Sequence, residues 1–231
     1  MPQISFNDVS VVRNDNTLLQ PFSLTLQEHR IGIIGSNGSG KSTLVRLING
    51  LEEPSTGEVF YDGIPLATRS AEVRRRVGFV FSDAESQIVM PQVHDDVAFS
   101  LKKFKLSKAE KEQRVDEVLE RFKLLHKAEQ SPHTLSGGEK QLLALAAVLV
   151  TEPTTIIADE PTTLLDLRNR RRIIAELNSL DQQTIVVTHD LELLSDFDRV
   201  VCVNDGVIAY DGTPADSIQF YTQLMEPNSE D

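Results

Sequence analysis

The sequence predicts an α/β protein with a parallel sheet at its centre, and three observations support this. Four short apolar runs typical of buried strands, "IGII", "TTIIAD", "TIVVTH" and "RVVCVN", are separated by segments of helical character. Residues 35–40 form a glycine-rich stretch between the first run and an apolar pattern at helical spacing. The 231 residues are 40% hydrophobic and 25% charged, which is ordinary for a globular protein with a sizeable core.

The first 92 residues read as strands and one helix. Residues 3–30 alternate apolar and polar positions, which predicts two antiparallel strands around the turn "RNDNT". Residues 31–50 predict a strand, the glycine loop and a helix. Two further strands are predicted in "STGEVFYDG" and "RRRVGFVFSD".

The middle of the chain is mostly helical from Val93 to about Val150. Ser107, three residues before Glu110, predicts a helix N-terminus. One face of that helix carries Val115, Val118, Leu119, Phe122 and Leu125. Strand and helix patterns then alternate again, and the polar tail "MEPNSED" is expected to fray. We therefore expect a single domain of residues 1–231, with residues 1–92 and 150–231 as its core and about 93–149 as a helical subdomain.

Composition excludes several classes of protein. The net charge of −12 argues against a duplex-DNA or anionic-lipid binder, because such proteins need a basic footprint. Cys202 is the single cysteine and lies in an apolar run, so we expect a buried hydrophobe rather than a disulfide. The longest apolar run, "LLALAAVLV", is too short to cross a membrane, and the N-terminus lacks the pattern of a secretory signal. A cytosolic protein is expected.

The stretch "GSNGSGKS", from Gly35 to Ser42 and called the phosphate loop below, fits the pattern G-x-x-x-x-G-K-[ST]. Backbone N–H groups can surround phosphates only where side chains stay out of the way, which explains the glycines. Lys41 supplies a positive charge, the Ser42 hydroxyl can bind Mg²⁺, and Thr43 can bond the α-phosphate. The predicted contacts of ATP here are Gly35, Ser36, Asn37, Gly38, Ser39, Gly40, Lys41, Ser42 and Thr43. The alternative is a chance glycine-rich turn, which the strand–loop–helix context disfavours.

Two acidic residues and a histidine follow later strands. Asp159 ends the run "TTIIAD", where a carboxylate can hold Mg²⁺ together with Ser42. Glu160 comes next and could act as general base toward the attacking water. The alternative reading is a helix cap followed by a surface acid. His189 ends another buried strand and could contact the γ-phosphate, although a histidine in such a position is more often structural.

The motif "LSGGEKQ", Leu135 to Gln141, places a serine and two glycines before an apolar helix and predicts a second anion-binding helix N-terminus. Together with the phosphate loop, "IIADEP", the "LLD" at Leu164 and "THD", this motif makes the chain resemble the ATP-binding cassette family over nearly its whole length. The resemblance implies a P-loop NTPase (RecA-like) core with an antiparallel β subdomain and a helical subdomain. It also implies a dimer with two ATP molecules sandwiched between the chains. Ser136, Gly137 and Gly138 would then contact the partner's ATP, Asp166 would communicate between sites, and His189 would sense the γ-phosphate.

Within that family, the stretch "VGFVFSDAESQIVMPQVHDDVAFSL" resembles the ATPases of energy-coupling-factor importers. Ser82 stands where the family usually has the switch-loop glutamine, and Gln87 matches a second glutamine of the pattern. Either a water bridges from Ser82 or Gln87 takes part of that role. Arg13 falls near the position where relatives stack an aromatic ring on adenine, and a guanidinium can also stack there. Val12 or Phe6 are the alternatives.

The resemblance implies a function. We expect the ATP-hydrolysing subunit of an energy-coupling-factor importer, using ATP and Mg²⁺, at the cytoplasmic face of the cell membrane. Its expected partners are a second ATPase, with a homodimer favoured, an integral transmembrane subunit and a substrate-binding membrane subunit; nucleic acid is not expected. Biotin is the favoured cargo. The alternatives are a cobalt, nickel or other importer of the family, or a member without a transport role; a small-molecule kinase would leave "LSGGEKQ" unexplained.

Overall fold

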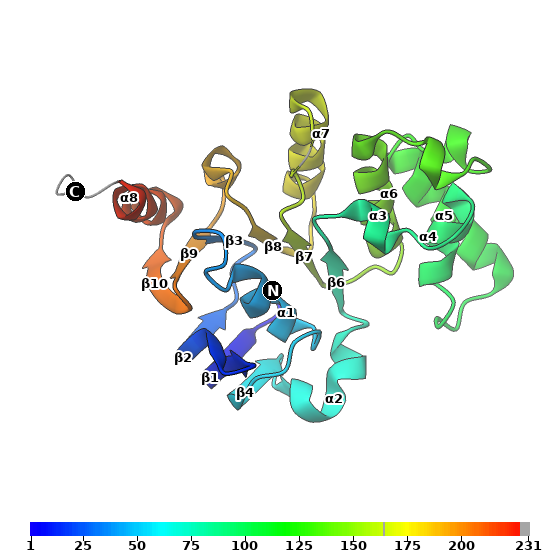
Figure 1. Ribbon diagram of the computed structural model, residues 1–231. Coiled ribbons are helices and arrows are strands. Elements are labelled where there is room, and N and C mark those ends of the chain that lie inside the picture. Colours follow the sequence, from blue (N-terminus) through cyan, green and yellow to red (C-terminus); the bar gives the residue numbers. More distant parts are fainter. Residues whose placement is uncertain (164, 227–231) are drawn as a thin grey trace.

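A computed structural model describes residues 1–163 and 165–226 and contains two sheets (Figure 1). One is an antiparallel sheet with strand order β2-β1-β4-β5, and the other is a six-stranded sheet with order β10-β9-β3-β8-β7-β6. The larger sheet is parallel except for its edge strand β10. The predicted fold class is confirmed. Leu164 and most of the tail "MEPNSED" lie outside the described residues, so the expectations for them are not addressed.

The strands have the following bounds. The antiparallel sheet contains β1 (Ile4–Arg13), β2 (Asn16–Leu26), β4 (Thr56–Tyr61) and β5 (Ile64–Pro65). The larger sheet contains β3 (Arg30–Ile34), β6 (Val77–Val80), β7 (Thr155–Asp159), β8 (Gln183–Val187), β9 (Arg199–Asn204) and β10 (Val207–Gly212). The antiparallel pairing of β1 with β2 around "RNDNT" is as the sequence predicts.

The helices complete the element order. They are α1 (Lys41–Ile48), α2 (Leu66–Val73), α3 (Ala84–Gln87), α4 (Val93–Ser100), α5 (Lys108–Arg121), α6 (Gly137–Leu149), α7 (Leu167–Asn178) and α8 (Pro214–Met225). Three short 3-10 helices are η1 (Leu125–Lys127), η2 (Pro132–Thr134) and η3 (Leu191–Leu194). We propose the subdomain boundaries given above, because α4 begins at Val93 and α6 ends at Leu149. The sequence patterns do not predict α2, β10 or α8.

Alternation along the central strands divides the interior into two cores. Ile157 and Ile185 belong to the core that includes the antiparallel sheet and α1. Their neighbours Ile156 and Val186 belong to the core that includes residues of α4 to α7. Successive side chains of a strand point to opposite faces, so both faces of the parallel sheet are covered. This burial on both faces explains why these strands read as continuous apolar runs.

The cap predicted for α5 is present. The Ser107 side chain accepts a hydrogen bond from the Glu110 backbone, and the Glu110 carboxylate accepts one from the Ser107 backbone. Four residues of the predicted apolar face are buried, namely Val115, Val118, Leu119 and Phe122. Leu125 is partly buried against the same core. The reciprocal cap therefore fixes where the helix begins, and the core fixes which face it buries.

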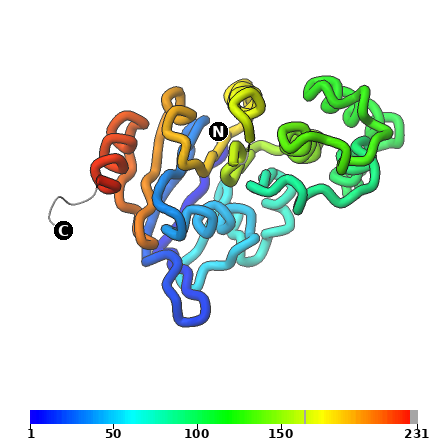
Figure 2. Tube along the Cα trace, turned by 45° about the horizontal axis from the view of Figure 1, so that its top comes forward, coloured from blue at the N-terminus to red at the C-terminus, as the bar shows by residue number. Residues whose placement is uncertain are grey.

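Some of the helices lie at the two opposite edges of the larger sheet. Helices α3 to α6 form a group beside β6, and α8 lies beside β10 at the opposite edge (Figure 1). The view in Figure 2 shows the same separation, with α8 in red and the α4–α6 group in green. Within residues 1–163 and 165–226, no helix combines the length and apolar character needed to cross a bilayer.

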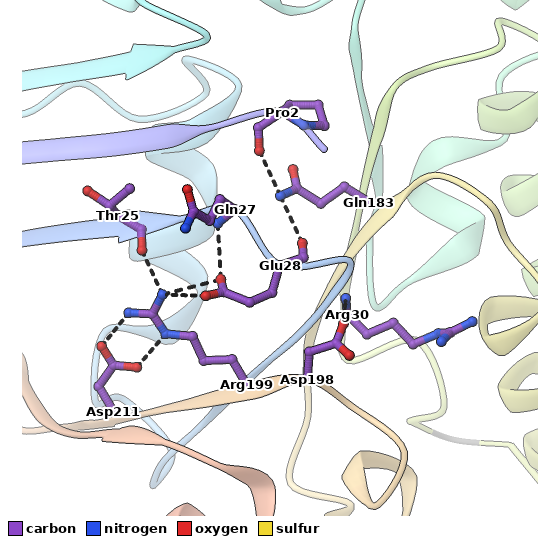
Figure 3. Close-up of polar contacts among 9 residues, drawn as sticks. All are labelled: Pro2, Thr25, Gln27, Glu28, Arg30, Gln183, Asp198, Arg199 and Asp211. Atoms are coloured by element: carbon purple, nitrogen blue, oxygen red, sulfur yellow. Dashed lines mark hydrogen bonds and ion pairs between the residues drawn. The ribbon is translucent and has the colours of Figure 1, made fainter.

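The amino ends of the parallel strands carry a polar junction (Figure 3). Arg199, the first residue of β9, donates to both Asp211 of β10 and Glu28, and also to the Thr25 carbonyl of β2. The Gln183 amide donates to the backbone carbonyls of Pro2 and Glu28, both at 3.0 Å. These contacts join the two sheets at the end of the parallel strands that faces away from the phosphate loop.

Candidate functional site

The phosphate loop joins the carboxyl end of β3 to α1, and its glycines are required by close backbone contacts. Gly35 has φ +148°, and a Cβ there would lie 2.0 Å from the Val203 carbonyl oxygen. Gly40 has φ +105°, and a Cβ there would lie 2.7 Å from the Leu18 carbonyl oxygen. Side chains larger than hydrogen would therefore displace neighbouring strands. The resulting cradle at a helix N-terminus suits a phosphate group.

Lys41 places its ammonium group inside this loop. Its Nζ donates hydrogen bonds to the backbone carbonyls of Gly35 at 2.9 Å and Ser36 at 2.8 Å. Burial lowers the pKa of Lys41, and the nearby carboxylates of Glu160 and Asp159 oppose that shift. An anionic ligand would stabilise the buried ammonium group, because the charge of the ligand compensates for the solvation that the group has lost.

Ser42 and Asp159 meet where a metal would be expected. The Ser42 hydroxyl donates to Asp159 Oδ1 at 3.0 Å, and Arg46 lies 3.7 Å from Asp159 Oδ2. Burial raises the pKa of Asp159, and the Ser42 hydrogen bond partly offsets this. In the described part of the chain, no three acidic, histidine or cysteine residues are arranged so that they could hold a metal ion by themselves. One hydroxyl and one carboxylate suit Mg²⁺, which usually takes its remaining ligands from phosphates and water.

Glu160 directly follows β7 and adopts an unusual backbone conformation. Its φ is +52°, although it is not a glycine. Its backbone N–H donates to the Val187 carbonyl at 2.9 Å, which holds the residue beside the end of β8. Glu160 Oε2 lies 2.8 Å from His189 Nδ1 and accepts a weak bond from the Thr163 hydroxyl at 3.4 Å. Such backbone strain is often stored at functional sites.

Glu160, His189 and the first residues of the phosphate loop line one cavity of about 550 Å³ at the carboxyl ends of the parallel strands, whereas Lys41, Ser42 and Asp159 are not part of its lining. Its lining comprises Gly35, Ser36, Asn37, Ser82, Glu160, Thr163, His189 and Tyr221. Open α/β sheets bind ligands at this edge. Thr163 and Tyr221 are additions that the sequence does not predict. Thr163 follows Glu160 closely enough to be suspected, whereas no sequence signal points to Tyr221.

Other predicted site residues lie elsewhere. Ser136 caps α6 and shares a reciprocal cap with Glu139. Gly137 and Gly138 form the first turn of that helix, and a Cβ on Gly138 would lie 2.2 Å from the Asn169 side chain of α7. Asp166 caps α7 through the Asn169 backbone N–H at 2.8 Å. None of these groups lines the cavity, so one chain alone does not bring them to it.

Three predicted positions have their own local partners. Arg13, at the end of β1, is paired with Glu52. The Gln87 amide bonds to the backbone of Phe81 at 3.2 Å and of Phe79 at 3.3 Å, whereas Ser82 faces the cavity. Thr43 lies in the first turn of α1. The roles assigned to these residues from the sequence stay predictions.

A strand, phosphate loop and helix beside an acidic strand end define a P-loop nucleoside triphosphatase. The sequence profile of the family described as "ABC transporter" matches residues 19–163. The chain therefore belongs to the ABC transporter family, and it is an ATPase that binds ATP with Mg²⁺.

Several curated relatives are similar over almost the whole chain. A "Putative ABC transporter ATP-binding protein" of Deinococcus radiodurans is 50% identical over 96% of this chain and 98% of its own. The "Biotin transport ATP-binding protein BioM" of Rhizobium etli is 44% identical over 96% and 98%. The "Energy-coupling factor transporter ATP-binding protein EcfA1" of Latilactobacillus sakei is 34% identical over 85% and 72%. These relatives confirm the resemblance stated from the sequence.

Solved structures agree with this assignment. The cbiO1 protein of Clostridium perfringens, described as part of the ABC transporter complex cbiONQ, superposes with a TM-score of 0.82 at 29% identity. It covers 97% of this chain and 95% of its own. An ATP-binding cassette captured as a dimer in a post-hydrolysis state, bound to ADP and Pi, gives 0.79 at 28% identity over 91% and 98%.

Proposed function

We propose that this chain is the ATP-hydrolysing subunit of an energy-coupling-factor importer and that its cargo is biotin. The mechanism rests on the observation that two groups of predicted ATP-binding residues lie apart in one chain. The cavity is lined by the start of the phosphate loop, Glu160 and His189, while Ser136 and its glycines lie outside it. A second chain can supply that turn to the terminal phosphate. The biotin assignment rests on the 44% identity to a biotin transport ATPase.

The chain's own residues would perform hydrolysis as follows. Lys41 and the loop amides bind and neutralise the β- and γ-phosphates, and Ser42 with Asp159 would hold the metal. Mg²⁺ bound by these two residues would neutralise part of the charge on the phosphates. Glu160 accepts a proton from the attacking water, and His189 fixes the carboxylate through its Nδ1. Positioning and electrostatics provide most of the catalysis.

Dimer closure would complete each site. The helix α6 N-terminus presents the Ser136 cap, Gly137 and Gly138, a phosphate-binding arrangement that one chain's cavity does not use. We propose that two identical chains bind two ATP molecules between them, with Asp166 at the contact. Both halves of a site are intact in this sequence, which favours a homodimer.

Membrane partners would convert this closure into transport. The stretch that resembles energy-coupling-factor ATPases exposes large apolar residues, Val89 and Phe99. Exposed apolar side chains of this kind suit a protein interface. We propose that an integral transmembrane subunit docks on this stretch and that a substrate-binding membrane subunit selects the cargo. The ATPase would then lie peripherally at the cytoplasmic face.

Purification with the native membrane partners tests the proposal. Mass spectrometry of the complex should identify two integral subunits, and reconstituted liposomes should hydrolyse ATP faster when biotin is supplied outside. Stimulation by cobalt or nickel instead would overturn the biotin assignment and leave the ATPase role intact. A complex that contains no integral membrane protein would overturn the importer proposal.

A further inference from the structure

The C-terminal helix α8 contributes one residue to the nucleotide cavity. Tyr221 shares that cavity with the start of the phosphate loop, Glu160 and His189. None of the motifs that define the site includes it. Helix α8 lies at the β10 edge of the sheet, opposite the group of α4 to α6 (Figures 1 and 2). Tyr221 therefore lines the cavity from α8, an element to which the sequence motifs assign no role.

Helix α8 is held firmly enough to position this side chain. The buried Ser217 hydroxyl donates to the Val200 carbonyl of β9 at 2.7 Å. Phe220 stacks on Tyr210 of β10 with ring centroids 5.0 Å apart and planes 21° apart. The Thr213 cap fixes the first turn. Ser217 and Phe220, which precede Tyr221 on the helix, are packed on β9 and β10, so the sheet sets the position of this part of α8, whereas residues 222–226 are exposed.

Few side-chain hydroxyls in the cavity lining are free to donate a hydrogen bond to a terminal phosphate. Thr163 donates its hydroxyl to Glu160, and His189 Nδ1 also faces that carboxylate. The side-chain hydroxyls left in the lining are those of Ser36, Ser82 and Tyr221. Ser36 and Ser82 sit on loops, whereas Tyr221 sits on a packed helix. A tyrosine hydroxyl is protonated at neutral pH and can donate a hydrogen bond; burial raises the pKa of Tyr221 further.

We propose that the Tyr221 hydroxyl donates a hydrogen bond to the terminal phosphate of bound ATP. A triphosphate whose β-phosphate occupies the phosphate loop places its third phosphate in this cavity, beside Lys41 and Glu160. A donor there offsets repulsion between the phosphate and the Glu160 carboxylate. ADP lacks the group that would receive this bond. Tyr221 would thus help the site to distinguish ATP from ADP, an inference that rests on the proposed ATPase role.

The test is Tyr221→Phe in the full chain, which removes the hydroxyl and keeps the ring. Binding of ATP and ADP with Mg²⁺ is measured in a Glu160→Gln background, so that ATP stays intact during titration. We expect ATP affinity to fall about tenfold or more, as for a bond to a charged group, with ADP affinity unchanged. With Glu160 restored, kcat/KM for ATP should fall by a similar factor.

Tyr210→Phe is the matched control, because it removes a hydroxyl from the other ring of the same aromatic stack. It should leave both affinities and the melting temperature unchanged. Equal losses of ATP and ADP affinity in Tyr221→Phe, a lowered melting temperature, or no change at all would overturn the inference. If the parent protein hydrolyses ATP and Tyr221→Phe matches it, only this inference fails. If the parent protein does not hydrolyse ATP, the proposed function fails with it.

Discussion

At the scale of single residues, Glu160 combines an unusual backbone conformation with side-chain contacts to two neighbours. Its backbone lies in the left-handed region, and its carboxylate faces His189 and Thr163. The sequence singles out Glu160 because it follows Asp159 at the end of a buried strand. Neither its φ nor its contact with a histidine 29 positions later follows from a local pattern. Such contacts depend on which strand ends become neighbours in the sheet, here β7 and β8.

Glu160→Gln should abolish most turnover while preserving ATP binding. The amide keeps the size of the side chain but cannot accept the proton from water, so kcat should fall roughly 10²- to 10⁴-fold. Steady-state hydrolysis and ATP titration measure the two effects. Glu117→Gln, on the exposed face of α5, is the control and should behave like the parent. If Glu160→Gln hydrolyses ATP at the parental rate, the general base must be another group.

Ser82 and Gln87 show where sequence matching stops. The pattern aligned both with glutamine positions of the family and left the choice between them open. The structure turns the Gln87 amide onto the backbone at the end of β6 and leaves Ser82 at the cavity. Which of the two residues responds to nucleotide stays a prediction.

At the scale of elements, the N-terminus of α6 combines a cap with an ion pair. The Glu139 carboxylate accepts from the Ser136 backbone at 2.9 Å and from Lys127 Nζ at 2.6 Å. The Lys127 bond, helped by the cap, lowers the pKa of Glu139 below its usual 4.5. The motif "LSGGEKQ" predicts the helix start but not Lys127, which lies on a 3-10 turn outside the motif.

Glu139→Gln should weaken this helix start in a pH-dependent way. Glutamine keeps the cap but loses the charge, so the free energy of unfolding at pH 7 should fall by about 0.5 kcal/mol. Since the folded pKa is depressed, the parent's advantage is present above pH 4.5 and disappears as the pH falls through the folded value. Urea denaturation from pH 3 to pH 7 measures it. Glu110→Gln, at a similar cap without a lysine, should show a smaller dependence.

Helix α7 is tied to the loop that carries His189. Arg170 lies 2.5 Å from Asp190 Oδ1, and Asp190 Oδ2 is buried without a hydrogen-bond partner in the described residues. Asp166 caps the same helix one turn earlier, since the Arg170 backbone N–H donates to its carbonyl at 2.8 Å. A shift of the α7 N-terminus would therefore act directly on the residue beside His189.

Arg170→Ala should destabilise the fold and slow hydrolysis together. The substitution leaves Asp190 buried and unpaired, which should lower the free energy of unfolding by about 1–3 kcal/mol. Loss of the anchor should also reduce kcat more than ATP affinity, because His189 loses its fixed position. Arg170→Lys should recover part of both losses. If Arg170→Ala keeps the parental kcat, then α7 does not influence the position of His189.

At the scale of the whole molecule, one arginine takes part in joining the two sheets. Arg199 contacts β10, β2 and the segment before β3 (Figure 3). Asp211 and Glu28 raise the pKa of Arg199, so its charge persists over any accessible pH. Networks with paired geometry contribute more than isolated surface pairs.

Arg199→Ala should lower the free energy of unfolding by about 1–3 kcal/mol, because Asp211 and Glu28 lose a shared partner. Nucleotide affinity should stay close to parental, since the junction lies at the amino ends of the strands. Urea unfolding measures the first effect and ATP titration the second. Arg114→Ala removes a single exposed pair with Glu152 and should change stability by less than about 0.5 kcal/mol. Equal effects of the two variants would contradict the role of the junction.

The sequence predicted the larger sheet except for its β10 edge, for physical reasons. Strands β3, β7, β8 and β9 are buried on both faces and therefore read as unbroken apolar runs. Strand β10 is only half-buried, and α8 has Ser217 as its one fully buried residue, so neither produces a clear pattern. Helix α2 is short and kinked at Arg69. Tyr221 was therefore hidden twice, on an unpredicted helix and far from every motif.

The lone thiol offers a practical consequence. Cys202 is fully covered and belongs to β9, the strand between β10 and β3 in the larger sheet. A maleimide dye should leave the native molecule unlabelled and react once β9 separates from its neighbours. The rate of that modification would therefore measure how often β9 becomes exposed, and no cysteine need be introduced. Cysteines introduced on the surface could then carry spin or fluorescent tags without background.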